Sequence, residues 1–499
     1  MNSASTHAPS PPPGSRLLAP AAAIVGFLIG YFSMHRGLYN DGIFFVQWLS
    51  DWELLPGEKH VWLYPHLLYL PLAKGFHKFI NLFWESRIDE SLKLFSAVFL
   101  GVSGPFLARL FLTFAKPALA AFGVLIVFFT PSVWYFAGAT EIHTLHLAAA
   151  AFALSAAVKP YKSFPNGWFI FGALCLQATH LTGCLLFPAM ILLRERHDSQ
   201  GGPWRPSRII KNGILISVFV VLLAGIAYLL HVVFPEHSVL REYFAIHPGD
   251  QPALTTIWVE LILRSGVVIA FALVCAVLLI KKDAWAAASA LITFALYAAF
   301  IGGTHVEYQG GYNIPAVMIW TLAIIYYIKN WSKTAAIAAA AMILAAQIGA
   351  GWLEVKKPIQ TNLYRETTDH YKSAATAGDT VIVYIPTGAV DFDLMQLPNL
   401  TRLYLSELNL FNSALLDSRN AAIPSVPYLN DAESQQLIQQ MKEAFTHARA
   451  AGKRIFVAFE AYESTAATPR LEAFSKWLRE HYDIAARHER ARLIELRER

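Results

Sequence analysis

Two acidic residues stand at the ends of apolar segments, where a carboxylate could do chemistry. Asp41 lies in YNDGIFFVQW, directly after the first apolar segment, and Glu141 lies in TEIHTLH at the start of a later one. An ionisable group near membrane depth costs about 2.5 to 3.5 kcal/mol at the centre of a span, so such groups mark cavities or sites. Asp41 could act as a general base or could cap a helix at Ile43–Trp52. Glu141 could act in a site or could complement a helix dipole.

Three histidines follow in the same part of the sequence. His143 and His146 are three residues apart and therefore share one helix face, a spacing that could hold a divalent metal. No third ligand stands near them in the sequence, so a metal is not favoured. His180 lies in ATHLTG between two short apolar segments, where it either binds a ligand or holds the two segments together.

Arg264 is the arginine of an apolar segment. It follows Glu260 by four residues, which allows an ion pair within one helix. An arginine in the outer third of a span is also suited to a bidentate contact with a phosphate. Both interpretations stay open.

The stretch HVEYQGGYNIP precedes a late apolar segment and carries Glu307, Tyr308 and Tyr312. Aromatic rings at this position could stack on a ligand, or could belong to the aromatic belt of a membrane interface. These three residues are the last of the candidate site.

Composition defines the elements that must position these residues. The chain has 499 residues, of which 55% are hydrophobic and 15% charged, and the apolar residues form blocks long enough to span lipid. The net charge of +5 comes from short clusters of Lys and Arg between those blocks, as the positive-inside rule predicts, so nucleic acid is excluded as a partner. The three cysteines lie inside apolar segments without metal-type spacing and are interpreted as packing residues.

The apolar blocks predict about eleven transmembrane helices. The first, Leu17–Met34, is followed by HRG instead of a cleavage site and is therefore a retained anchor. The others are Leu92–Phe114, Ala118–Trp134, Glu141–Val158, Trp168–Thr179, Cys184–Leu193, Ile209–Phe234, Thr255–Ile280, Trp285–Ile301, Tyr312–Ile328 and Ala335–Trp352.

Charge predicts the topology. With the N-terminus inside, the even-numbered gaps contain the basic clusters, provided that Trp168–Leu193 forms two short spans. All the candidate residues then gather at the outer face of the membrane. The first outer loop, residues 35–91, contains two amphipathic stretches, Ile43–Trp52 and Trp62–Phe79, which we expect to lie in the headgroup plane.

The chain after Trp352 has the composition of a soluble domain. Two apolar runs, Val381–Pro386 and Arg454–Ala461, alternate with helices predicted at Asp431–Ala450 and Pro469–Tyr482. We therefore expect an α-helical polytopic membrane protein with a disordered cytoplasmic tail (1–16), a transmembrane domain (17–352) and a small extracytoplasmic α/β domain (353–499). The α/β domain carries no phosphate loop and no Cys/His cluster, which favours support or acceptor recognition over catalysis.

Taken together, these motifs resemble the GT-C class of membrane glycosyltransferases, which includes protein O-mannosyltransferases and lipid A aminoarabinose transferases. The resemblance covers most of Leu17–Trp352 and is most similar to the protein O-mannosyltransferase-like branch. It departs from the common pattern at Asp41, which is followed by Gly42 where many members have Glu or Ser. The matching features are Asp41 in the first outer loop, Pro131–His146, Gly172–Pro188 and the EYQGGYNIP stretch.

The resemblance implies a polyprenyl-phosphate sugar donor and a glycan, lipid or protein acceptor on the outer side of the inner membrane. The donor is already activated because its phosphate leaves as a stabilised anion, so one carboxylate base suffices, and that role falls to Asp41. Glu141 would orient sugar or acceptor hydroxyl groups, and the other substrate-binding residues would be His143, His180, Arg264, Glu307, Tyr308 and Tyr312.

Two other functions also fit parts of the sequence. A transporter or lipid flippase needs membrane-depth charges and broken spans, although it more often shows paired halves and midplane sites. A non-catalytic scaffold could recruit an envelope partner through the C-terminal domain.

Overall fold

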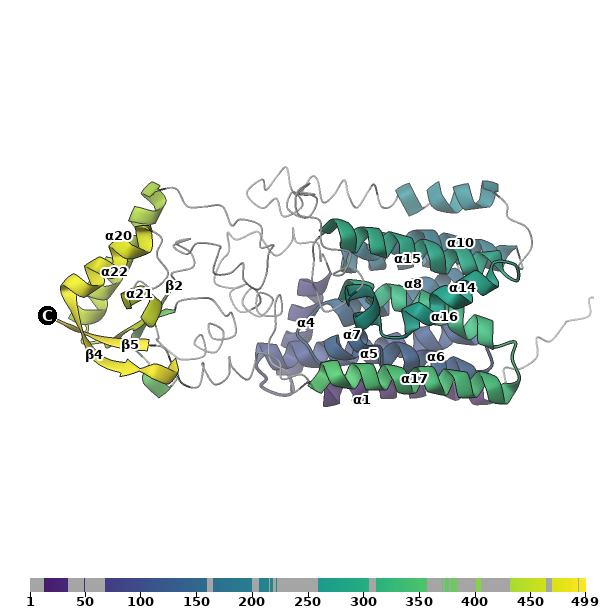
Figure 1. The fold of residues 1–499 in the computed structure, drawn as a ribbon, viewed down its shortest axis with the longest axis horizontal. Coiled ribbons are helices and arrows are strands. Elements are labelled where there is room, and N and C mark those ends of the chain that lie inside the picture. Colours follow the sequence, from purple (N-terminus) through teal and green to yellow (C-terminus); the bar gives the residue numbers. More distant parts are fainter. Residues whose placement is uncertain are drawn as a thin grey trace, which may run out of the picture. The chain divides into compact units, whose positions relative to one another are not determined.

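The computed structural model describes residues 13–34, 49, 68–158, 165–199, 206–214, 216–218, 221, 259–304, 311–356, 370, 373–376, 378–383, 401–404, 431–463, 469–491 and 493–499. These residues divide into two compact units, one ending at Lys357 and the other beginning at Pro358. The first unit is a bundle of helices, and the second contains a β-sheet (Figure 1).

Apolar helices build the first unit. Five of them are long and apolar enough to cross a membrane among the residues described, and three shorter apolar helices accompany them. The predicted multi-span helical class is therefore confirmed, while the count of eleven spans stays a prediction. The helices are α1 (Pro13–Phe32), α4 (Tyr69–Asn81), α5 (Ile88–Leu112), α6 (Pro117–Phe128), α7 (Pro131–Phe136), α8 (His143–Val158), α9 (Pro165–Thr179), α10 (Phe187–Asp198), α14 (Val268–Leu279), α15 (Ala284–Thr304), α16 (Ile314–Ile328) and α17 (Lys333–Lys356), with the short turns η1 (Leu181–Leu186), η3 (Val259–Leu263) and η4 (Gly311–Asn313).

Small residues bring α1 and α5 into close antiparallel contact. A Cβ atom built on Gly30 would lie 2.5 Å from the Cα of Ala97, and one built on Gly104 would lie 2.5 Å from the carbonyl carbon of Ala22. In lipid there is little hydrophobic drive between helices, so backbone approach through small residues supplies the packing energy. This contact fixes the end of α1, which leads into the segment that contains Asp41.

Two predicted spans are interrupted. The stretch predicted at Ala118–Trp134 ends as α6 at Phe128, and α7 begins at Pro131, because proline lacks an amide proton and forces the preceding Thr130 into an extended conformation (φ −61°, ψ 134°). The stretch predicted at Thr255–Ile280 contains a break at Gly266, where φ is +66°. Length and hydrophobicity do not reveal such breaks.

The chain reverses direction from helix to helix, so the connections gather at two ends of the bundle. We call one the histidine end, which contains the segments 137–143, 180–186 and 311–313. We call the other the arginine end, which contains the segments 113–116, 194–199, 280–284 and 328–333. Side-chain contacts join the segments within each end.

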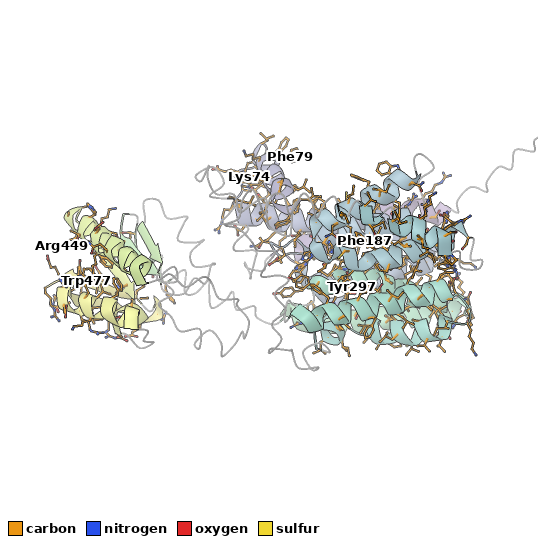
Figure 2. All side chains as sticks on the ribbon, turned by 90° about the horizontal axis from the view of Figure 1, so that it is seen from above. Lys74, Phe79, Phe187, Tyr297, Arg449 and Trp477 are labelled. Atoms are coloured by element: carbon orange, nitrogen blue, oxygen red, sulfur yellow. The ribbon has the colours of Figure 1, made fainter. Side chains whose placement is uncertain are left out.

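Helix α4 lies in the predicted amphipathic stretch Trp62–Phe79. Tyr69, Leu70 and Ala73 are buried on one face, whereas Phe79 is 54% exposed and projects from the unit (Figure 2). The apolar exposed face suits contact with lipid, as expected for a helix in the headgroup plane. The other predicted amphipathic stretch lies outside the described residues except for Leu49.

The second unit is a five-stranded sheet with the order β2-β1-β3-β5-β4, in which β1 pairs in parallel with β2 and β3 and β5 is antiparallel to its neighbours. The predicted small α/β unit is confirmed, but three strands were not foreseen, since β4 and β5 are rich in charged residues and β2 is short. The elements are β1 (Thr380–Val383), β2 (Thr401–Tyr404), α20 (Asp431–Ala450), β3 (Ile455–Ala458), α21 (Phe459–Glu463), α22 (Pro469–His481), β4 (Tyr482–His488), η7 (Glu489–Ala491) and β5 (Leu493–Glu498).

Helices α20 and α22 share one apolar core with the sheet. The Phe445 ring lies 5.9 Å from that of Trp477 and 6.4 Å from that of Phe474, between centroids. These rings from the two helices cover Ile455 and Val457 of the central strand.

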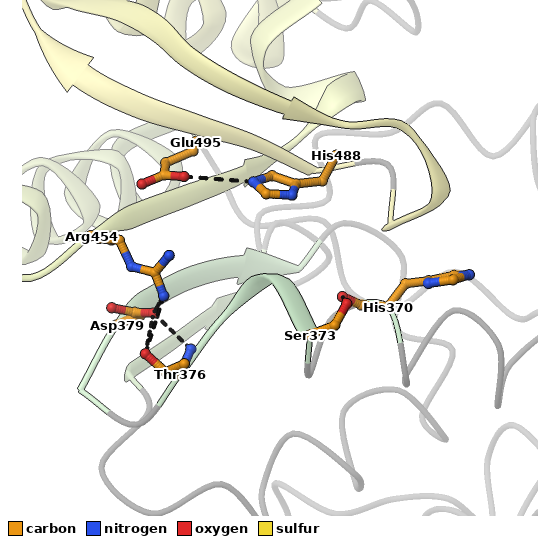
Figure 3. Close-up of polar contacts among 7 residues, drawn as sticks. All are labelled: His370, Ser373, Thr376, Asp379, Arg454, His488 and Glu495. Carbon is orange, nitrogen blue, oxygen red and sulfur yellow. Dashed lines mark hydrogen bonds and ion pairs between the residues drawn. The ribbon is translucent and has the colours of Figure 1, made fainter.

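An ion pair with an additional hydrogen bond joins the starts of two parallel strands in the same unit. The Arg454 guanidinium donates to Asp379 Oδ2 at 2.7 Å, and the Thr376 amide donates to the same oxygen at 2.7 Å (Figure 3). Asp379 precedes β1 and Arg454 precedes β3, so this contact ties the register of the two strands and explains these polar residues structurally.

Candidate functional site

The loop that carries Glu141 is fixed by its neighbours at the histidine end. The Ser96 hydroxyl of α5 donates to the carbonyls of Ala139 at 2.6 Å and of Glu141 at 3.3 Å. A Cβ atom on Gly138 would lie 2.1 Å from the carbonyl oxygen of Ser33, so the loop packs directly on the end of α1. Glu141 itself is 2% exposed. A carboxylate is thus held inside the bundle by backbone contacts.

Three histidines and a tyrosine meet beside this loop. Ring centroids are 5.2 Å apart for His146 and His180, 5.1 Å for His180 and Tyr312, and 6.0 Å for His143 and Tyr312. All four side chains are buried, and they come from α8, the α9–η1 junction and η4. We call these four residues the histidine cluster.

Hydrogen bonds fix the proton positions on two of the rings. His180 caps η1, and its Nδ1 accepts the amide of Thr182 at 3.0 Å, so neutral His180 carries its proton on Nε2. The Thr179 hydroxyl donates to the Leu176 carbonyl at 2.8 Å and therefore accepts from Nδ1 of His146 at 2.9 Å. Neutral His146 thus presents an acceptor at Nε2, and His180 presents a donor there.

Gly311 allows η4 to reach His143. A Cβ atom at this position would lie 2.4 Å from Nε2 of His143, so no other residue fits without moving the imidazole. This close approach explains the glycine of the QGGYNIP stretch and brings Tyr312 into the cluster.

Tyr69 is a member of the site that sequence analysis missed. The Leu68 amide donates to the Ala178 carbonyl at 3.1 Å, which ties the start of α4 to the end of α9. Burial, and secondarily the charge of Glu141, raise the pKa of Tyr69 well above its ordinary value, so the phenol keeps its proton. Tyr69 lies in the predicted amphipathic stretch Trp62–Phe79, and the aromatic residues of that stretch were the sequence signal that could have identified it.

A buried ion pair at the start of α5 was also missed. Lys93 Nζ lies 3.4 Å from Asp89 Oδ2, and both side chains are only 9% exposed. Lys93 precedes Ser96 by one helical turn and so shares the face that supports the Glu141 loop. Both residues stand at the start of an apolar segment, and this position was the sequence signal that could have identified the pair.

Three buried hydroxyl groups between the start of α7 and the start of α8 have no hydrogen-bond partner among the described residues: Ser132 of α7, Thr140 of the loop and Thr144 of α8. Buried polar groups in proteins are normally satisfied by protein, water or ligand. These hydroxyl groups are therefore suited to an external polar molecule.

The structure brings together Glu141, His143, His180 and Tyr312 from the predicted site. Arg264 is half-buried at the junction of η3 and α14, and its contact with a phosphate stays a prediction. Asp41, Glu307 and Tyr308 lie outside the described residues. Within the described part of the chain, no group of three or more His, Cys, Asp or Glu residues could hold a metal ion.

Comparison with known proteins gives a fold. No family profile and no curated protein sequence matches the chain. The structure is similar to ArnT from Cupriavidus metallidurans in the apo state, with a TM-score of 0.57 and 12% identity over 97% of each chain. It is also similar to the same protein bound to undecaprenyl phosphate, with a TM-score of 0.58 and 12% identity over 97% of this chain and 98% of that one. ArnT is a GT-C glycosyltransferase, and the fold of this chain is therefore the GT-C fold that the sequence predicted.

Proposed function

We propose that the chain is an integral-membrane glycosyltransferase that moves a sugar from a polyprenyl-phosphate donor to an acceptor on the outer side of the membrane. The observation that carries this proposal is the burial of Glu141 and the histidine cluster at one end of a GT-C fold. The binding of undecaprenyl phosphate by ArnT supports the class of donor.

The proposed reaction needs one base. As the acceptor oxygen bonds to the anomeric carbon of the sugar, its proton passes to the carboxylate of Asp41. The bond between the sugar and the phosphate breaks at the same time, and the phosphate leaves on its lipid carrier. Because that anion is stable, no protein nucleophile is required.

The described residues divide the other tasks by charge. The buried rings of the histidine cluster suit contact with an uncharged sugar, and the Tyr69 phenol keeps its proton. Glu141 can accept from a sugar or acceptor hydroxyl. The positive charge of Arg264 suits the donor phosphate.

The proposed location is the inner membrane, with the C-terminal domain in the periplasm. The parity of the basic clusters around Lys281–Lys282 and Lys329–Lys333 supports this topology. A C-terminal alkaline phosphatase fusion should be active, and a fluorescent protein that folds only in the cytoplasm should be dark at the same place. The opposite pair of results would remove the outer location of the site.

The test of the reaction uses purified full-length protein, a panel of polyprenyl-phosphate sugars and cell-envelope extract. We expect release of carrier phosphate that depends on both donor and extract. Transport of the carrier without sugar transfer would instead indicate a transporter or flippase.

Asp41→Asn tests the proposed base. It keeps the size of the side chain and its ability to cap a helix, so membrane insertion and donor binding should stay nearly normal while kcat falls by about a hundredfold or more. Asp41→Glu should retain part of the activity. Transfer by Asp41→Asn at the wild-type rate would show that Asp41 is only a cap, and Glu141 would then be tested as the base.

A further inference from the structure

Two helix breaks occur at similar depth in the bundle. One separates α6 from α7 at Thr130, and the other separates η3 from α14 at residues 264–267, where Gly266 has a φ of +66°. Each break leaves backbone or side-chain polar groups in a region where water is excluded. Irregular backbone at membrane depth persists only where protein groups satisfy it or where it lines a cavity.

One side chain joins both breaks. Gln347 of α17 is fully buried, and its Nε2 donates to the Ser265 carbonyl at 3.1 Å and to the Thr130 hydroxyl at 3.0 Å. Its Oε1 accepts the amide of Val267 at 3.1 Å. The Thr130 hydroxyl in turn donates to the Ile126 carbonyl at 2.8 Å. Both donor hydrogens of the amide are used.

The fit around Gln347 is tight. A Cβ atom built on Gly266 would lie 1.9 Å from Oε1 of Gln347, so any side chain there would displace the amide. Gly266 thus serves two needs, because it adopts the left-handed conformation and leaves room for the amide.

The position of this contact places it in the half of the bundle nearer to the histidine end. Gln347 follows the start of α17 at Lys333 by roughly 21 Å, given the rise of about 1.5 Å per residue. Lys333 belongs to the arginine end, so the breaks lie on the side of the bundle where the candidate site is found.

Each break leads directly into a candidate site segment. Arg264 immediately precedes Ser265, whose carbonyl Gln347 binds. Thr130 immediately precedes α7, which leads to the loop that carries Glu141. A single amide therefore bonds both breaks, one directly beside Arg264 and the other at the start of the helix that leads to Glu141.

We propose that Gln347 is a positioning residue that sets Arg264 for contact with the donor phosphate. This inference rests on the proposed function and deepens it, because it assigns a residue that touches no substrate to the recognition of the carrier phosphate. Gln347 acts by holding the η3–α14 break in one conformation.

The test measures binding of undecaprenyl phosphate to the purified full-length protein, together with donor KM and acceptor KM. Gln347→Met keeps the length of the side chain and removes its hydrogen bonds. We expect carrier binding to weaken and donor KM to rise by about tenfold or more, since displacement of about 1 Å can cost up to a hundredfold, with acceptor KM unchanged. Gly266→Ala should give the same defect, because the methyl group displaces the amide.

A double-mutant cycle separates positioning from general support of the fold. If Gln347 acts through Arg264, Arg264→Lys should weaken carrier binding and the double variant with Gln347→Met should be no worse than either single variant. Thr293→Val is the control, because Thr293 is buried and, among the described residues, its hydroxyl bonds only the Ser289 carbonyl of its own helix, at 2.7 Å. It should leave carrier binding unchanged.

The failures of the two proposals are distinguishable. Sugar transfer by the wild type, with normal carrier binding by both Gln347→Met and Arg264→Lys, overturns the positioning role and leaves the proposed function standing. Additive effects, or equal changes in donor and acceptor KM, also overturn it in favour of structural support. A wild-type protein that binds no carrier phosphate overturns both proposals.

Discussion

The two ends of the helical bundle both contain polar side chains that are half-buried or buried, but they use them differently. At the arginine end, Arg196 Nε donates to Asp283 at 2.8 Å and Nη2 donates to the Tyr326 hydroxyl at 2.7 Å. Its guanidinium also lies 5.1 Å from the centroid of the Phe114 ring. These contacts tie α10, α15 and α16 together, and we call them the arginine staple.

At the histidine end, the buried polar groups are imidazole rings, hydroxyls and the carboxylate of Glu141. Ser132, Thr140 and Thr144 have buried hydroxyls without a hydrogen-bond partner among the described residues. The comparison teaches that burial of polar residues alone does not identify a site. The hydrogen bonds that Arg196 makes to Asp283 and Tyr326 explain the arginine staple structurally, whereas the three hydroxyls have no such explanation among the described residues.

The largest effect is expected at His180. His180→Asn keeps a side-chain acceptor for the Thr182 amide but removes the imidazole, so we expect near-normal thermal stability and a loss of transfer activity on the order of a hundredfold. His180→Ala should lose the cap as well and should cost about 1 kcal/mol of additional stability. Thermal midpoints and kcat/KM of the two variants give the answer. Full activity of His180→Asn would make this residue a cap alone.

The next effect is expected at the arginine staple. Arg196→Gln should lower the free energy of unfolding by about 1.5 to 3 kcal/mol, because a hydrogen-bonded charge is removed and Asp283 loses its partner. Activity per folded molecule should not change. Arg208→Gln is the control, since Arg208 is half-buried and, in the described structure, its side chain bonds the Asp198 carbonyl; it should cost less than about 0.5 kcal/mol. If Arg196→Gln lost activity without losing stability, the arginine end would have a functional role and the proposed difference between the two ends would be wrong.

A smaller effect is expected from pH. Burial raises the pKa of Asp283, but hydrogen bonds from Tyr326 and the Ala286 amide, with the charge of Arg196, outweigh it and leave the pKa below its ordinary value of 3.8. Because the folded-state pKa is the lower one, the staple stabilises the fold above the unfolded pKa and this stability is lost as pH falls through the folded pKa. The thermal midpoint of the wild type should therefore fall below about pH 4 more steeply than that of Asp283→Asn. Parallel curves would contradict the assignment.

The smallest effect is expected from the hydroxyl groups without partners. Ser132→Ala and Thr144→Val should leave the stability of the ligand-free protein unchanged or slightly higher, because no hydrogen bond is lost. Each should raise donor or acceptor KM several-fold if the hydroxyl binds substrate. Ser96→Ala is the matched control, since this hydroxyl bonds the Ala139 carbonyl at 2.6 Å and its removal should cost about 1 kcal/mol. Unchanged kinetics in both hydroxyl variants would favour ordered water as their partner.

Part of the candidate site could be predicted because its signal is local. Glu141, His143 and His180 are polar residues inside apolar stretches, and Tyr312 follows a pair of glycines, so each is conspicuous in the sequence. Tyr69 and the pair of Asp89 and Lys93 were missed. Their stretches look like an interfacial helix and an ordinary helix start until the fold places them beside the loop that contains Glu141.

The sequence by itself determined the membrane class and the α/β character of the C-terminal unit, and the resemblance of its motifs to a known family predicted the GT-C fold. Lipid requires long apolar helices, and the lengths of the apolar blocks and the charges that flank them can be read from the sequence. Only the tertiary structure decided which nitrogen of His146 and His180 carries the proton, and that Gln347 joins two helix breaks. Those properties depend on partners far apart in the sequence, such as Gln347 and Thr130, and no local pattern encodes the distance between them.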